Sequence, residues 1–137
     1  MDWNSSEGKQ LAERMSREQV IWLTTVRKDG TPTPTPVWFL WEGETILIYT
    51  IPGTLKLKNI TANPHASVNL NADEHGGQVV VFTGSISVEK DQVPAIQNQA
   101  YLQKYQQGIK SLQMTPETFS GRFSVPLRFR PSHIRAN

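Results

Sequence analysis

The sequence predicts a mainly β fold, an antiparallel barrel of six strands with accompanying helices, in a single domain over residues 1–137. Three observations support this fold class. Six segments have the alternating or β-branched pattern of strands. Nine Gly and nine Pro supply many turns. A chain of 137 residues suits one hydrophobic core. Helical periodicity is expected at the N-terminus, after the third strand and after the fifth strand.

The first expected elements are a helix and a β-hairpin. Within residues 5–18, Leu11 and Met15 lie four residues apart among charged and amide side chains, as on a helix with one apolar stripe. Residues 20–26 form a β-branched strand, and Asp29-Gly30 suits the tight turn that follows, because both residues tolerate positive φ angles. Residues 31–41 then form the second strand.

The second strand opens with three prolines that alternate with threonines. In an extended chain, Pro32, Pro34 and Pro36 remove every backbone donor from one side. That side cannot form a normal ladder. It is either a sheet edge protected against aggregation or an edge left open beside a ligand.

The remaining elements complete the barrel. A third strand is expected at 45–51, followed by a helix at 54–63 that is capped by Thr54 and ends before Pro64. Two more strands are expected at 66–71 and 78–88. A long helix at 91–113, interrupted near Gly108, a short helix starting at Thr115-Pro116 and a last strand at 122–130 complete the order. In the last strand Phe123, Val125, Leu127 and Phe129 alternate with polar residues or Pro, which indicates one buried face.

Composition excludes several classes of function. The net charge is only +2, without the clustered basic face that nucleic-acid binding requires, and the absence of Cys excludes disulfides and thiolate chemistry. His65, His75 and His133 lack metal-ligand spacing, so no metal site is expected. We find no signal-peptide pattern and no apolar run of about 18 residues, which predicts a cytoplasmic protein without a membrane segment.

Two segments carry candidate binding chemistry. Gly53-Thr54-Leu55-Lys56-Leu57-Lys58 opens a helix with N–H donors and positive charge, as a phosphate site requires. Lys56 and Lys58 lie ~200° apart around a helix, so they converge only on an anion near its end; otherwise both are solvated lysines. Residues 36–41 are apolar without alternation, so both strand faces need cover. A dimer interface, a flat aromatic ligand or core packing would provide it.

These segments together resemble a known family. The stretches Pro36–Trp41 (PVWFLW), Tyr49–Ile60 (YTIPGTLKLKNI) and Asn63–Val68 (NPHASV) resemble the split β-barrel flavoproteins, which include pyridoxamine 5'-phosphate oxidases and short FMN- or F420-dependent reductases. Leu23–Pro32 (LTTVRKDGTP) is similar to their first hairpin. The similarity covers residues 20–88 well and 123–135 more loosely.

The resemblance implies a Greek-key split barrel and a homodimer with cofactor sites at its interface. The expected cofactor is FMN, with F420 as the alternative. The implied contacts are Pro36, Val37, Trp38 and Phe39 along the ring system, Tyr49 and Thr50 at its edge, Thr54, Lys56 and Lys58 at the phosphate, and Gln78 as a further ring contact.

Arg128 and Arg130 share one face of the last strand. They either hold an anionic substrate or the partner subunit's cofactor phosphate, for which Arg is suited, or form ion pairs. No catalytic acid, base or nucleophile is evident, and a flavin enzyme requires none. We therefore expect an FMN-dependent oxidoreductase acting on an unidentified small molecule. The alternatives are an F420-dependent reductase and a non-catalytic flavin- or haem-binding module.

The sequence also departs from true pyridoxamine-phosphate oxidases. Thr35 and Leu40 stand where basic residues are expected, and Arg130-Pro131-Ser132-His133 has the wrong spacing for the Arg-x-His element of those enzymes. Oxidation of vitamin B6 is therefore not the expected reaction.

Overall fold

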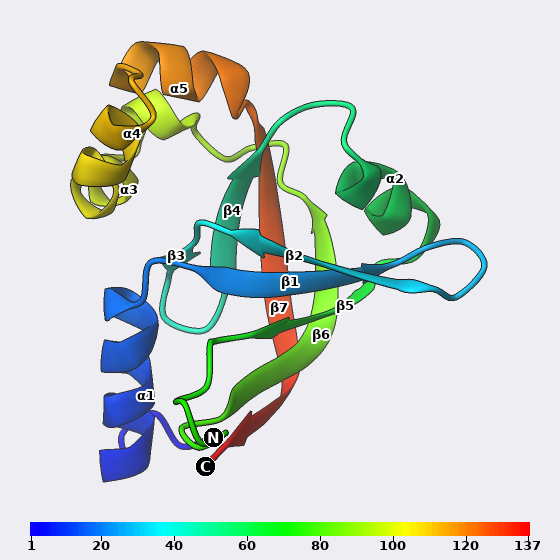
Figure 1. The fold of residues 1–137 in the computed structure, drawn as a ribbon, viewed down its shortest axis with the longest axis vertical. Helices are drawn as coiled ribbons and strands as arrows, with labels where there is room; N and C mark the ends of the chain where they lie inside the picture. The colour runs from blue at the N-terminus through cyan, green and yellow to red at the C-terminus, as the bar shows by residue number, and fades with distance from the viewer.

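The computed structural model describes residues 1–137 as one curled antiparallel sheet with helices at both ends (Figure 1). The strands are β1 (Ile21–Val26), β2 (Pro32–Val37), β3 (Leu40–Trp41), β4 (Ile46–Thr50), β5 (His65–Asn69), β6 (Val80–Val88) and β7 (Val125–Ala136). The helices are α1 (Ser6–Arg17), α2 (Leu55–Ala62), the 3₁₀ helix η1 (Ala95–Gln97), α3 (Gln99–Lys104), α4 (Gln106–Ser111) and α5 (Pro116–Arg122). The expected mainly β, antiparallel class is confirmed.

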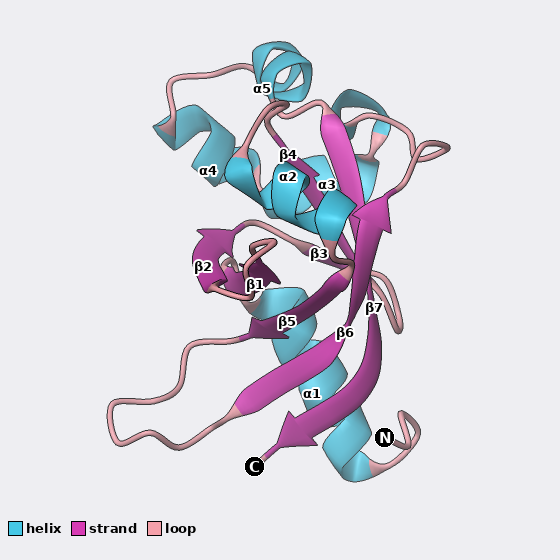
Figure 2. Ribbon diagram, turned by 90° about the vertical axis from the view of Figure 1, so that its right-hand side faces the viewer, coloured by secondary structure: helices cyan, strands magenta, loops and turns pink.

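The strand order is β2-β1-β5-β6-β7-β4-β3, so β2 and β3 are the two edges of the open barrel. Figure 2 shows α1 at one end of the molecule and α2–α5 gathered at the other, in agreement with Figure 1. Both views place the two termini close together. No helix combines the length and apolar character that crossing a membrane requires.

The prolines of β2 protect a sheet edge. β1 and β2 form the expected hairpin, with Ile21 opposite Val37 and Val26 opposite Pro32. Since prolines cannot donate, the threonines between them supply the ladder N–H groups, and the missing donors face outward from the edge. Pro36 also lines a pocket described below, so the alternative of an edge beside a ligand stays a prediction.

The sheet has seven strands rather than six, because the expected strand 31–41 breaks at Trp38-Phe39. The Phe39 N–H donates to the hydroxyl of Tyr105 (2.8 Å), and the Phe39 carbonyl accepts from the ammonium of Lys104 (2.9 Å). Side chains at the end of α3 therefore satisfy backbone groups that a continuous strand would have paired in its ladder. The chain crosses here from one edge of the sheet to the other.

The expected helix at 91–113 is also divided, into η1, α3 and α4. Asn98 ends η1 and caps α3, where its side chain accepts from the Tyr101 N–H (3.1 Å). Tyr105 separates α3 from α4 with a non-helical backbone (φ −108°, ψ 17°). The expected interruption near Gly108 is wrong: Gly108 lies within α4, and the breaks fall at the capping Asn98 and at Tyr105, whose hydroxyl is fixed to Phe39.

The last strand begins at Val125 and extends beyond residue 130 to Ala136; residues 125–129 pair with β4, and residues 127–136 pair with β6. A register shift between Thr83 and Gly84 places Gly84 opposite Pro131. A Cβ on Gly84 would collide with the backbone of Arg130, so this close approach requires glycine.

The strand β4 separates two cores. Its five residues are all buried, with Ile46 and Ile48 in the barrel core and Leu47 and Tyr49 in a second core under α3–α5. The buried members of the second core are Leu47, Tyr49, Ala95, Tyr101, Tyr105, Ile109 and Phe119. The candidate site lies against this second, aromatic core.

Candidate functional site

A pocket of about 380 Å³ opens between the sheet, the start of α2 and the α3–α5 layer. This volume is within the range of small-molecule and cofactor sites. The residues that line it are Val20, Pro36, Val37, Trp38, Tyr49, Thr50, Lys56, Tyr101, Leu112, Phe119 and Phe123. Figure 1 shows why these segments meet: α2 and the α3–α5 layer flank the same end of β4.

Trp38 forms a rigid wall of the pocket. Its indole stacks on Tyr105 (centroids 4.5 Å apart, planes 6° apart) and on Phe119 (5.5 Å, 19°). The neighbouring helix α4 approaches closely at Gly108, where an added Cβ would lie 2.8 Å from the indole ring. Trp38 is therefore positioned by the break at Phe39 on one side and by the aromatic layer on the other.

Lys56 is the only charged residue that lines the pocket. Its side chain is half-buried, and no carboxylate lies within ion-pair distance of its ammonium. Burial lowers the pKa of its amine. An unpaired ammonium beside apolar walls is attracted to an anionic ligand. Lys58, two residues further along α2, is exposed and lies outside the pocket.

The position of Lys56 depends on a polar contact that holds α2 to the hairpin. Asn59 is buried in α2, and its amide donates to the hydroxyls of Thr25 (3.0 Å) and Thr33 (2.8 Å). These bonds fix both β1 and β2 against the helix. The first turn of α2 is thereby fixed next to Pro36 and Val37 of the same hairpin.

Two hydroxyl groups close to the pocket have no hydrogen-bond partner. Thr54 is the N-cap of α2, yet its side chain makes no capping bond, and its buried Oγ1 is unpaired. Tyr101, which lines the pocket and is fully buried, also has an unpaired hydroxyl. Buried polar atoms are nearly always paired. Lys56 together with these hydroxyls fits a ligand with an anionic tail and polar ring atoms.

The structure brings together six of the ten residues expected at the cofactor. They are Pro36, Val37, Trp38, Tyr49, Thr50 and Lys56. Thr54 precedes Lys56 at the start of the same helix. The other three lie elsewhere in this chain.

Phe39 is fully buried in the barrel core, and its backbone N–H and carbonyl are both bonded. Lys58 is exposed to solvent. Gln78 lines a separate hollow beside α1, where its carbonyl accepts from the guanidinium of Arg14 (2.6 Å). Contacts of these three residues with a cofactor remain predictions of the resemblance.

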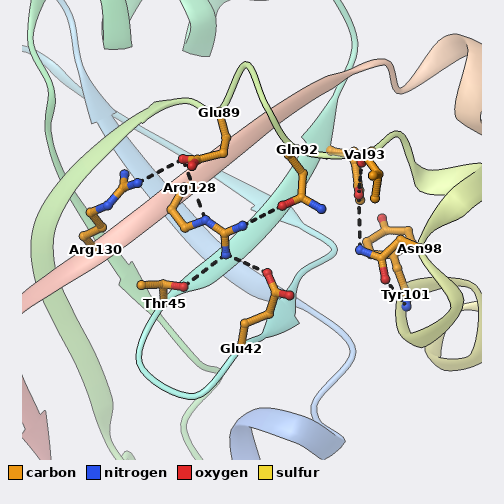
Figure 3. Close-up of polar contacts among 10 residues, drawn as sticks. Glu42, Thr45, Glu89, Gln92, Val93, Asn98, Tyr101, Arg128 and Arg130 are labelled. Atoms are coloured by element: carbon orange, nitrogen blue, oxygen red, sulfur yellow. Dashed lines mark hydrogen bonds and ion pairs between the residues drawn. The ribbon is translucent and has the colours of Figure 1, made fainter.

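Arg128 and Arg130 form ion pairs away from the pocket. Figure 3 shows the Arg128 guanidinium between Glu42 (2.6 Å), Thr45 (3.0 Å) and Gln92 (2.7 Å). Its Nε lies 3.8 Å from Glu89, which also binds Arg130 at 3.0 Å. Within the chain, both arginines therefore form ion pairs, which is the second of the two roles expected for them.

The sequence did not identify five residues that line the pocket. These are Val20, Tyr101, Leu112, Phe119 and Phe123. Four of them come from the segment 99–123. The apolar pattern of this segment indicates that its residues are buried, but it does not indicate that they pack over β4. The unpaired hydroxyl of Tyr101 is a feature of tertiary packing and leaves no signal in the sequence.

Comparison with known proteins identifies the family and the fold. A family model described as pyridoxamine 5'-phosphate oxidase matches residues 8–122. No curated protein sequence matches the chain. A solved structure described as an F420 reductase is 26% identical, with a TM-score of 0.67, over 88% of this chain and 92% of that chain.

Two further solved structures share the fold at lower identity. An FAD-binding protein from Mesorhizobium loti is 17% identical (TM-score 0.66, 92% of this chain and 88% of that chain). A haem-storage protein from Vibrio cholerae is 18% identical (TM-score 0.62, 95% and 92%). The curled seven-stranded sheet is thus the split barrel of this group. Because the family model covers most of its length, the chain belongs to the pyridoxamine 5'-phosphate oxidase family.

Proposed function

We propose that this protein is a flavin-dependent oxidoreductase that acts on a small molecule, with FMN or F420 bound in the pocket beside α2. The observation that carries the proposal is the single unpaired cation, Lys56, at the edge of an otherwise apolar and aromatic pocket. A planar ring with an anionic tail matches this pocket, because the ring suits the apolar and aromatic walls and the negative charge suits Lys56. Six residues implied by the family resemblance line this one pocket.

Each part of the pocket has a separate task. Lys56 and the hydroxyl of Thr54, next to the free N–H groups at the start of α2, would hold the phosphate. Pro36, Val37 and Trp38 would cover the ring and exclude water from it. The bound flavin supplies hydride transfer, so the protein needs only to bind, orient and shield the reacting partners.

FMN and F420 are both compatible with these residues. Each has a tricyclic ring and a phosphate, and the solved relatives include an F420 reductase and an FAD-binding protein. FMN is our first choice of cofactor because a single lysine faces the pocket, which matches one phosphate without an extended acidic tail.

The test is cofactor titration with two lysine variants. We expect Lys56→Gln to weaken the binding of FMN or F420 by about ten- to a hundredfold, since a charge-assisted bond contributes about 1.5–3 kcal/mol. Lys58→Gln is the matched control and should change affinity less than about twofold, because a solvated charge contributes little. Fluorescence quenching measures both.

The proposal fails if the wild-type protein takes up neither cofactor saturably. Equal effects of the two substitutions would instead place the anionic tail outside the pocket, near the exposed flank of α2.

A second candidate is a module that holds a flavin without turnover. It is supported by the absence of carboxylates and histidines, the commonest general acids and bases, from the pocket lining. Reduction of the loaded protein followed by a panel of acceptors separates the candidates: turnover above that of free flavin excludes a passive module.

The homodimer with interfacial sites also remains a proposal. Leu55 and Leu112, each about half exposed, lie at the start of α2 and in the pocket lining, where a second copy would bury them. In such a dimer Arg130, which is half exposed, is the arginine with donors available to a partner's cofactor.

A further inference from the structure

The hydroxyl of Tyr101 is the least explained polar group in the molecule. Tyr101 is fully buried in the aromatic core, packed edge-on against Tyr49 (centroids 4.9 Å apart) and next to Tyr105 (4.9 Å). Its backbone N–H is capped by Asn98. Its hydroxyl, by contrast, has no hydrogen-bond partner, although the residue lines the pocket.

The two neighbouring tyrosines show that this core can satisfy a buried hydroxyl. Tyr105 accepts from the Phe39 N–H and lies within bonding distance of the Gln19 and Phe39 carbonyls (2.7 and 2.9 Å). The Tyr49 hydroxyl donates to the Val93 carbonyl at 2.7 Å. Of these three tyrosines, only Tyr101 carries an unpaired hydroxyl, which costs stability that a phenylalanine would not. Folding alone therefore gives no reason for the oxygen.

The chemistry of the pocket suggests a reason. The lining supplies one cation, Lys56 on α2, and apolar walls, while Tyr101 approaches from α3 on the opposite layer. Burial, reinforced by Tyr105 and Tyr49, raises the pKa of the Tyr101 hydroxyl, which keeps its proton. Tyr101 is thus a permanent hydrogen-bond donor, suited to an oxygen acceptor on a ligand whose tail is held by Lys56.

We propose that the Tyr101 hydroxyl donates a hydrogen bond to a carbonyl oxygen of the bound flavin ring. This inference rests on the proposed function, and it assigns to the α3–α5 layer a direct role in binding the cofactor. In this structure the hydroxyl has almost no solvent-accessible surface. Contact with a bound ring would therefore require a neighbouring side chain of the pocket wall to move.

The experiment compares Tyr101→Phe with Tyr105→Phe in the full-length protein, with FMN as the probe. For Tyr101→Phe we expect affinity for FMN to fall about three- to tenfold, as for a lost neutral hydrogen bond. We also expect a ring-carbonyl stretching band of bound FMN to move to higher wavenumber. The melting temperature without FMN should stay equal or rise, because an unpaired polar atom is removed. Tyr105→Phe should lower that melting temperature.

Three outcomes would overturn the inference. One is unchanged FMN affinity together with an unchanged carbonyl band in Tyr101→Phe. Another is a lower melting temperature of that variant without FMN, which would show that the hydroxyl has a structural partner. The third is a wild-type protein that binds neither FMN nor F420, and this result removes the proposed function as well. Binding that depends on Lys56 but not on Tyr101 would remove only the present inference.

Discussion

Lys104 lies in an environment that disfavours its positive charge. Its ammonium donates to the Phe39 carbonyl (2.9 Å) and lies 3.9 Å from the centre of the Phe39 ring. No carboxylate lies within ion-pair distance of this ammonium. Burial lowers the pKa of the amine to about 8, an effect that the charge of Glu18 partly offsets. Lys104 helps to hold the break at Phe39 at the cost of a partly desolvated charge.

This perturbed amine predicts a pH dependence of stability. Between pH 8 and 10 the unfolded chain keeps the Lys104 proton while the folded chain loses it, so wild-type stability rises with pH. After a discount for partial exposure, we expect a rise of about 1 kcal/mol relative to Lys104→Met. Urea unfolding at pH 7.5 and 9.8 measures the difference.

The comparison has to stay below pH 10. Burial raises the pKa of Tyr101 and of Tyr105, so ionisation of these side chains in the unfolded chain lowers stability at higher pH. Parallel pH profiles of wild type and Lys104→Met would contradict the assignment.

At the scale of elements, the packing of α4 on Trp38 decides the shape of the pocket. Gly108 permits this contact because its missing Cβ leaves room for the indole ring. Gly121, in α5, has nothing within 4 Å of the position where a Cβ would lie. Substitution of the two glycines by alanine therefore distinguishes the effect of close packing at Gly108 from the effect of helix propensity alone at Gly121.

We expect Gly108→Ala to destabilise the protein by about 1–3 kcal/mol, since overpacking moves the Trp38 ring. The same substitution at Gly121 should stabilise by about 0.5–1 kcal/mol, the difference in helix propensity between glycine and alanine. Thermal unfolding measures the stabilities, and Trp fluorescence reports on the indole. A stabilising Gly108→Ala would show that α4 does not pack as closely as described.

At the scale of the whole molecule, Arg128 joins segments that are far apart in the sequence. Its guanidinium contacts the β3–β4 turn through Glu42 and the segment after β6 through Gln92 (Figure 3). The arginine side chain is only 13% exposed, whereas that of Arg130 is 49% exposed. The network thus holds the β3–β4 turn and the segment after β6 against β7.

Arg128→Met should cost about 2–4 kcal/mol, because it removes a mostly buried guanidinium and leaves Glu42 and Gln92 without their partner. Arg130→Met should cost less than about 1 kcal/mol, as exposed pairs do. Denaturant unfolding gives both values. If Arg128→Met proves neutral for stability but abolishes cofactor binding, the arginine serves a ligand rather than the fold.

Residues near one another in the sequence were enough to predict most of the strands, the hairpin of β1 and β2, the prolines that remove backbone donors from one side of β2, and the lysine-bearing start of α2. Each of these is local: alternation, a turn residue or a helix cap is visible in a few consecutive residues. Local patterns also sufficed for the family resemblance, and so for six of the residues that line the pocket.

Only the tertiary structure decided the break at Phe39, the division of the helix at Tyr105 and the place of Tyr101 in the pocket. All three depend on contacts over tens of residues, such as the bond from Phe39 to Tyr105. It also showed that Lys56, and not Lys58, lines the pocket. Such contacts depend on which surfaces pack together when the sheet curls. The pattern of residues along the chain does not specify which surfaces these are.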